Sequence, residues 1–188
     1  MALFSKVIAD RRYAKIASYI KGDVLELGCG NAQILAKYGS NIATYCGVER
    51  SAKLVEKLSQ KYPRMSFVQC DLDRDQLAID RTFDCVLMIA IIEHLFNQQF
   101  VMDKVAQMLK PGGIIVITTP TPFGNDIVHG LGAALGIFYK SAVDDHIVIY
   151  NRHRLKILAN EIGLKLKHHE YFQFYCNQVA ILEKIRNE

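Results

Sequence analysis

The chain has 188 residues, of which 51% are hydrophobic and 22% are charged. This length supports one α/β domain with a well-filled core and leaves little for a second domain. The net charge of +4 comes from basic residues scattered along the sequence. A nucleic-acid-binding protein more often carries a dense basic stripe with aromatic residues between, so we expect no nucleic-acid partner.

Cysteine usage and hydropathy bear on the location of the protein. The five cysteines are odd in number and include no C-x-x-C pair, which is typical of reduced, buried thiols. The first residues lack the charged and then apolar pattern of a secretory signal. The longest relaxed apolar stretch is Leu131–Tyr139, which is shorter than the roughly 18 residues that span a bilayer. We therefore expect a cytoplasmic protein without a transmembrane segment.

Apolar residues recur along the chain with helix and strand spacing in alternation. Residues 1–22 have helical spacing, and we interpret them as a helical cap. Strands are expected at residues 23–27, 43–48, 65–69, 83–88 and 114–118, and helices at 31–38, 51–61 and 97–109. Residues 120–150 interrupt the alternation, and they are followed by a helix at 150–162 and strands at 164–171 and 174–183. The whole chain, residues 1–188, is interpreted as one domain.

The first expected strand leads directly into a glycine turn. Val24, Leu25 and Leu27 form a short apolar run that suits a strand buried on both faces. Gly28 and Gly30 follow, and glycines permit a sharp turn and a close approach of backbone to a ligand. A helix-forming composition begins after them. Strand, glycine turn and helix in this order are typical of the opening unit of nucleotide-binding α/β folds.

Acidic residues end the next two expected strands. Glu49 follows the second strand, where a carboxylate accepts the ribose hydroxyls of a nucleotide, and Asp71 follows the third. Ligands of open parallel sheets bind outside the carboxyl ends of the strands. Either acid alone would be interpreted as a solvated loop carboxylate. Together with Gly28–Gly30, and in this order, they favour a site that holds one adenosine.

A dinucleotide dehydrogenase uses a similar layout. Its fingerprint has a third glycine or alanine for close helix–sheet packing, and Gln33 occupies that position here. The chain also has little room for a separate substrate domain. An NAD-dependent oxidoreductase is therefore disfavoured but stays open as an alternative. A non-catalytic subunit that binds a cofactor and activates a partner stays open as well.

Further motifs follow the glycine turn in order: Gly47-Val48-Glu49, Gln69–Leu72, Phe83–Leu87 with Ile92–Leu95, and Leu109–Gly113 running into a strand. With Val24–Gly30, they resemble the class I S-adenosylmethionine-dependent methyltransferases over nearly the whole chain. That resemblance implies a Rossmann-like, seven-stranded, mostly parallel sheet with an antiparallel last strand and helices on both faces. The Glu93-His94 pair is similar to the subgroup that includes the ubiquinone-biosynthesis O-methyltransferases and many small-molecule methyltransferases.

The resemblance implies S-adenosylmethionine as cofactor and S-adenosylhomocysteine as product. It assigns the methionine part to the backbone of Gly28, Cys29 and Gly30. Glu26 would steady the turn or receive the ammonium group through water. The remaining implied contacts are Glu49 on the ribose, Asp71 and Leu72 on the adenine, Arg50 against the adenine through its alkyl stem, and Met88 and Ile89 beneath the sulfonium. Apart from the resemblance, Arg12 of the helical cap is expected on the carboxylate, and a basic solvated helix face is the alternative.

The reaction needs a nucleophile held in line with the electrophilic methyl group, and a hydroxyl acceptor also benefits from a base. His94 is the first candidate for that base and His146 the second. A capping or supporting role for His94 and a surface-loop position for His146 are the alternatives. Glu93 is expected to form a cap or an ion pair, and no metal is expected because apolar residues flank it. Residues 120–150 are expected to recognise the substrate, a small molecule with an oxygen acceptor favoured.

Overall fold

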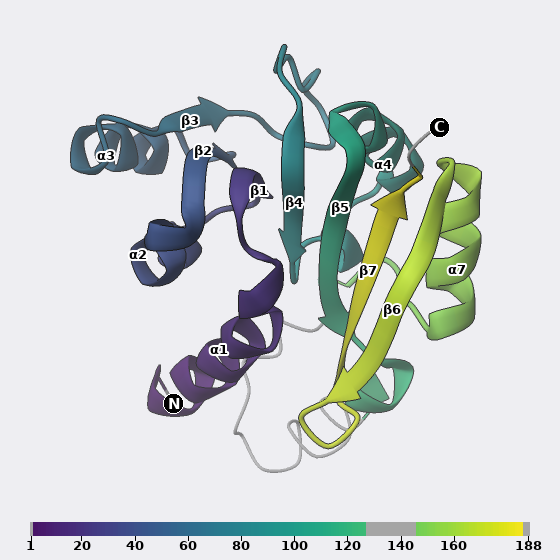
Figure 1. The fold of residues 1–188 in the computed structure, drawn as a ribbon. Coiled ribbons are helices and arrows are strands. Elements are labelled where there is room, and N and C mark those ends of the chain that lie inside the picture. The colour runs from purple at the N-terminus through teal and green to yellow at the C-terminus, as the bar shows by residue number, and fades with distance from the viewer. Residues whose placement is uncertain (1, 127–145, 186–188) are drawn as a thin grey trace.

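Seven strands form one sheet at the centre of the protein, and the structure, a computed structural model, describes residues 2–126 and 146–185. The strands are β1 (Gly22–Leu27), β2 (Ile42–Glu49), β3 (Ser66–Gln69), β4 (Phe83–Ile89), β5 (Leu109–Pro120), β6 (Leu164–Phe172) and β7 (Asn177–Lys184). Their order across the sheet is β3-β2-β1-β4-β5-β7-β6 (Figure 1). β7 runs antiparallel to both β5 and β6, and the other neighbours are parallel. The predicted sheet with an antiparallel last strand is confirmed.

Helices cover both faces of this sheet. One face carries the end of α1 (Ala2–Ile16) together with α2 (Gln33–Tyr38) and α3 (Ala52–Lys61). The other face carries α4 (Gln98–Gln107) and α7 (Arg152–Glu161), which Figure 1 shows behind the sheet. Short 3-10 turns connect these elements, among them η1 (Ala17–Tyr19), η2 (Gly39–Asn41) and η3 (Ile92–His94).

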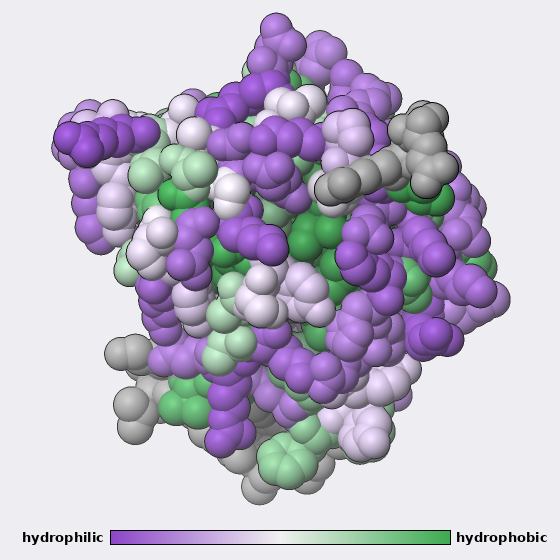
Figure 2. All heavy atoms as spheres, in the orientation of Figure 1, coloured by the Kyte–Doolittle hydropathy of each residue, from purple (hydrophilic) through white to green (hydrophobic). Residues whose placement is uncertain are grey.

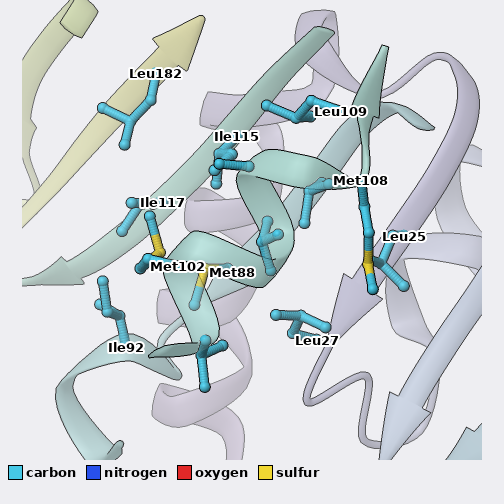
Figure 3. Packing of buried hydrophobic residues seen from close by; sticks show 14 of the residues in the cluster. Leu25, Leu27, Met88, Ile92, Met102, Met108, Leu109, Ile115, Ile117 and Leu182 are labelled. Carbon is cyan, nitrogen blue, oxygen red and sulfur yellow. The ribbon is translucent and has the colours of Figure 1, made fainter. Parts of the chain in front are cut away.

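Side chains of the central strands alternate between the two helical layers, as the two-residue period of a strand requires. One set packs against α4 and α7, and Figure 3 labels Leu25, Leu27, Met88, Ile115 and Ile117 of this set together with Met102 of α4. The other set includes Val24, Leu87 and Val116, which pack with Ile16 of α1 and Ile34 of α2. Because the central strands are buried on both faces, they form a rigid base for whatever follows their ends.

β5 begins at Leu109, five residues before the predicted start at 114. Leu109–Gly113, which the sequence places before the strand, lies inside β5 and contains a bulge. Phe83 of β4 pairs with Leu109, and the pairing resumes at Ile114 opposite Cys85. Gly113 permits this close packing, because an added Cβ would lie 3.0 Å from the carbonyl oxygen of Phe83. A bulge of this kind hides a strand start from sequence reasoning, because it interrupts the apolar run.

Other boundaries differ from the prediction by one to three residues. α2 begins at Gln33, where 31 is predicted, because Ala32 still has a left-handed φ of 51° and belongs to the glycine turn. β7 begins at Asn177, where 174 is predicted, because residues 173–175 all have positive φ and form the turn after β6. The predicted apolar stretch Leu131–Tyr139 lies outside the described residues, so only the two ends of the segment at 120–150 are described.

Hydropathy of the surface agrees with an ordinary globular exterior. In the orientation of Figure 1, hydrophilic residues dominate and hydrophobic residues appear as small patches (Figure 2). Within the described residues, no helix is long and apolar enough to cross a membrane. Four of the cysteines, at positions 29, 46, 70 and 85, are buried and free, as their sequence context predicts.

Candidate functional site

The glycine turn after β1 is open on one side. Gly28 and Gly30 have positive φ values of 65° and 51°. A hydrogen bond of 3.0 Å from Cys29 N to Val48 O fastens the turn to β2. An added Cβ at Gly28 would lie 2.9 Å from Ile91 Cδ1, whereas at Gly30 it would meet no atom within 4 Å. Bare backbone at Gly30 therefore borders open space, which fits a ligand that lies against the chain.

Glu49 reaches from the end of β2 onto this turn. Its Oε2 accepts a hydrogen bond of 3.2 Å from Gly30 N, and its Oε1 accepts one of 3.1 Å from Ser51 N. Ser51 is the N-cap of α3, so the carboxylate also lies near the positive end of a helix dipole. The structure thus brings the two strand ends together as predicted, with a half-buried carboxylate beside the open face of the turn.

Asp71 continues the same edge at the end of β3. Cys70 N donates to Glu49 O at 3.1 Å, which joins the end of β3 to that of β2. Asp71 Oδ1 accepts from Asp73 N at 3.2 Å, and Asp71 N donates to Asp75 Oδ2 at 2.8 Å. Asp71 is therefore held in a short carboxylate-rich loop while its side chain stays partly exposed. The adjacent Leu72 packs on the core.

Glu26 lies in β1 directly before the turn and is buried, with 5% of its surface exposed. Its Oε2 accepts a hydrogen bond of 2.5 Å from the Tyr45 hydroxyl. Burial raises the pKa of Glu26 to about 8, and the bond from Tyr45 opposes only part of that rise. Burial also raises the pKa of the Cys29 thiol to about 12. The carboxyl group thus supports the turn from below, and the thiol is protonated and unreactive at neutral pH.

The end of β4 separates the next two predicted residues. The Met88 side chain is fully buried in the core against α4 (Figure 3). Only the backbone of Met88 is therefore left to face a cofactor at the strand end. Ile89 points to the other face of the sheet and is half-buried. Arg50, which follows Glu49, is exposed.

The side chain of Arg12, a residue of α1, lies at the same edge of the sheet, on the side of β5 and β7. Its Nη2 donates to Asn177 Oδ1 at 3.0 Å, at the start of β7. Burial lowers the pKa of Arg12, and the neighbouring Glu93 carboxylate acts in the opposite direction. The structure therefore groups Arg12 with Glu93 and ties the helical cap to the strand ends.

Glu93, His94 and His146 form a cluster next to this arginine. Glu93 has 1% of its surface exposed, and its backbone carbonyl accepts hydrogen bonds from Ile147 N at 2.7 Å and Val148 N at 3.3 Å. These bonds hold the segment after residue 145 against η3. The rings of His94 and His146 consequently lie 4.9 Å apart between centroids. Burial raises the pKa of Glu93, opposed in part by hydrogen bonding and by the charges of His94 and Arg12.

Several polar residues around this cluster escape sequence reasoning. The Oδ1 atom of Asn125 lies 3.1 Å from His146 Nδ1. Gln98 accepts a hydrogen bond of 2.8 Å from the Tyr150 hydroxyl, and Gln178 donates to the Tyr150 carbonyl at 2.6 Å. Spacing along the chain carries no signal for these contacts, because the partners lie on different elements.

A cavity of about 700 Å³ lies at the opposite edge of the sheet, beside Gly22, Asp84 and Gly112. Lys110 forms ion pairs at that edge, with its Nζ 2.6 Å from Asp23 Oδ2 and 2.9 Å from Asp84 Oδ2. These residues lie at the amino ends of the parallel strands. The cavity is therefore separate from the site at their carboxyl ends, where ligands of such sheets bind.

Comparison with known proteins gives a consistent picture. A family model described as a methyltransferase domain matches residues 7–169. A probable S-adenosylmethionine-dependent methyltransferase of Mycolicibacterium smegmatis is 30% identical over 112 residues, which cover 57% of this chain and 42% of that protein. A ubiquinone biosynthesis O-methyltransferase of Rhizobium leguminosarum is 31% identical over 100 residues, which cover 51% of this chain and 39% of that protein. The chain thus matches about two fifths of the length of these relatives.

Among solved structures, the fold is similar to that of a complex between the Trm112 methyltransferase activator of Haloferax volcanii and a putative methyltransferase. The TM-score is 0.73 at 17% identity, and the match covers 96% of this chain and 93% of that one. At this identity the likeness concerns the fold alone.

Replacement of Glu26 by Gln tests the burial of its carboxyl group. Between the ordinary pKa of 4.5 and about 8, the folded chain holds a proton on Glu26 that the unfolded chain has lost. The free energy of unfolding therefore falls as the pH rises through this window. In Glu26→Gln this fall should be smaller. As the pH rises to about 8, the free energy of unfolding of the variant should therefore increase by on the order of 1–3 kcal/mol relative to that of the wild type.

Urea-induced unfolding over this pH range measures the effect. Glu56→Gln, at an exposed position of α3, is the matched control and should follow the wild-type profile. Parallel profiles for Glu26→Gln and the wild type would contradict the assignment.

Proposed function

Because the chain belongs to the class I S-adenosylmethionine-dependent methyltransferases, we propose that it transfers the methyl group of that cofactor to an oxygen atom of a small-molecule acceptor. The observation that carries the oxygen acceptor is the pair of imidazoles, His94 and His146, beside the end of β4. A hydroxyl must lose its proton as it attacks, and imidazole is the side chain suited to take it near neutral pH. The similarity to ubiquinone O-methyltransferases supports the same choice.

The proposed cofactor site runs along the carboxyl ends of β1, β2, β3 and β4. The open backbone at Gly30 fits the amino-acid part of the cofactor, and Glu49 is placed to accept its ribose hydroxyls. Asp71 lies one strand further, two residues after Gln69, which pairs with Glu49, and we assign the adenine to it. The same carboxylate that holds the turn in place would exchange its bond from Gly30 for bonds from the ribose, so the turn and the ligand share one acceptor.

The remaining proposed contacts differ in how much side chain they offer. Cys29 and Gly28 contribute backbone, and Glu26 supports them from below through Tyr45. Leu72 and Arg50 flank the adenine position, the latter with its alkyl stem. Met88 is limited to its backbone, and Ile89 lines the strand end with a half-buried side chain. Arg12, on the β7 side, is proposed for the carboxylate of the cofactor.

Bound cofactor supplies a methyl carbon that is electrophilic without further activation. The protein has to orient the acceptor and exclude water, and positioning of this kind lowers the barrier by roughly 7–11 kcal/mol. We assign the orientation of the acceptor to the cluster at η3 and to residues 146–150, which the Glu93 carbonyl holds in place. His94 then receives the acceptor proton, and His146 is the second candidate for this role. Residues 1–22 and 120–150 are proposed to cap this one domain on the cofactor and acceptor sides.

Cofactor binding is the first test of this function. We expect S-adenosylhomocysteine to bind the chain and NAD not to bind. Gly47→Ala should weaken the binding of S-adenosylhomocysteine by at least about tenfold, because its Cβ would lie 2.8 Å from Cys29 Sγ and displace the glycine turn. Gly39→Ala is the matched control, since its Cβ would meet only Leu35 Cδ1 at 3.6 Å.

Isothermal titration calorimetry of the wild type and the two variants measures these affinities. Binding of NAD in place of S-adenosylhomocysteine would support the oxidoreductase alternative. Absence of any cofactor binding would overturn the function together with the site.

Turnover of a His94→Ala variant tests the proposed base. Loss of the imidazole should lower kcat by about a hundredfold while the affinity for S-adenosylhomocysteine stays the same. His153→Ala, at an exposed position of α7, should match the wild type. The measurement is methyl transfer across a panel of hydroxylated small molecules, with calorimetry to verify cofactor binding. An unchanged kcat in His94→Ala would remove this residue from the proton transfer.

A further inference from the structure

Three metal-ligand side chains meet at the proposed acceptor side of the site. One ligand atom each from Glu93, His94 and His146 can be chosen so that all lie within 4.8 Å of one another. Glu93 and His94 are consecutive in η3, and His146 arrives from a segment more than fifty residues later. Neighbouring ligands of a bound ion are roughly 3–3.5 Å apart, given bonds of about 2.1 Å. The cluster is therefore somewhat wider than an occupied site and would close by rotation of the half-buried histidines.

Glu93 is the residue that most needs a further partner. Its side chain is almost fully buried, and its Oε2 makes no hydrogen bond within the described residues. A buried carboxylate oxygen without such a bond is costly, because it has lost its water, and the hydrogen bonding of the group with Thr119 does not reach this atom. The charge of Arg12 lies nearby, but the Nη2 of that residue is directed to Asn177. A cation between Glu93 and the two rings would give the carboxylate a direct partner.

The surroundings of His146 also suit a ligand role. Its Nδ1 lies 3.1 Å from Asn125 Oδ1. An amide oxygen only accepts hydrogen bonds, so the tautomer that uses this contact carries its ring proton on Nδ1 and its lone pair on Nε2. Metal-binding histidines characteristically donate their other ring N–H to an oxygen in this way, which fixes the tautomer and the ring orientation.

We infer that Glu93, His94 and His146 bind one divalent transition-metal ion. Two imidazoles with one carboxylate suit zinc, iron, cobalt or manganese, whereas magnesium and calcium prefer oxygen ligands. Three protein ligands leave coordination positions open, as in catalytic metal sites. The inference that the ion binds depends only on these side chains. The role of the ion in the reaction rests on the proposed function.

An ion at this position would lower the pKa of an acceptor hydroxyl and orient its oxygen. Because His94 and His146 would then be ligands, the acceptor proton would leave to water. The negative oxygen so formed would also balance the positive charges of the ion and of Arg12. The site therefore favours acceptors whose hydroxyl ionises readily, such as phenols, over acceptors with an amine. The prediction of no metal considers only the neighbours of Glu93 along the chain, and it cannot include His146 at its actual position.

Spectroscopic titration with Co²⁺ tests the inference. The full chain is first freed of metal with a chelator and dialysed. We expect one Co²⁺ per chain, with the visible absorption bands of a histidine-ligated ion, and one Zn²⁺ per chain by calorimetry. His146→Gln and Glu93→Gln should each weaken binding at least about tenfold. His153→Gln and His168→Gln, at exposed positions, are the matched controls and should bind as the wild type does.

Two results would overturn the inference. One is the absence of stoichiometric binding to the wild type. The other is equal binding by His146→Gln and the wild type; this half-exposed position keeps the test valid even where Glu93→Gln fails to fold. Titration of the same metal-free sample with S-adenosylhomocysteine separates the two proposals. Cofactor binding without metal binding contradicts only the metal site, and metal binding without cofactor binding contradicts only the proposed function.

Discussion

The hydrogen bond from Gly30 N to Glu49 Oε2 connects the two features on which the site depends. It joins the turn after β1 to the end of β2, and the bond from Cys29 N to Val48 O reinforces the junction. Both bonds exist because β1 and β2 are parallel and in register up to Leu27 and Val48. Parallel neighbours place the residues that follow them at one edge, so residues some twenty positions apart in the sequence become direct partners.

The same edge of the sheet holds two buried carboxyl groups, whose charged form is unfavourable in a protein interior. Glu26 and Glu93 are both buried, and burial raises the pKa of each. Their environments then differ. Tyr45 donates a hydrogen bond to Glu26, whereas Glu93 has the charges of His94 and Arg12 beside it. Glu26 is thus satisfied as a neutral group that supports the turn, whereas the charge of Arg12 opposes only part of the rise that burial causes in the pKa of Glu93. The two carboxyl groups therefore differ in role, one structural and one chemical, because their electrostatic environments differ.

The cofactor side of the site is predictable from sequence because each of its parts is local. Gly28–Gly30, Glu49 and Asp71 each directly follow an apolar run, and the parallel arrangement of those runs supplies the rest. The differences from the prediction have local physical causes too. A bulge conceals the start of β5 at Leu109, and the alternation of β4 directs the Met88 side chain into the core, so only its backbone is left for the predicted position beneath the sulfonium. Neither depends on residue type alone, so neither is visible in the sequence.

The acceptor side is built differently, and this difference explains why sequence reasoning stops there. His94 and His146 meet because the Glu93 carbonyl accepts two backbone hydrogen bonds from Ile147 and Val148. Backbone groups carry no sequence signature, so a contact of this kind has no motif. Asn125, which orients His146, comes from a third segment for the same reason. A sheet edge conserves its geometry whatever the side chains are, whereas an assembly of loops held by backbone bonds is free to differ between relatives. The position of the proposed methyl-donor site therefore follows from the fold, whereas the choice of acceptor has to be determined from the cluster itself.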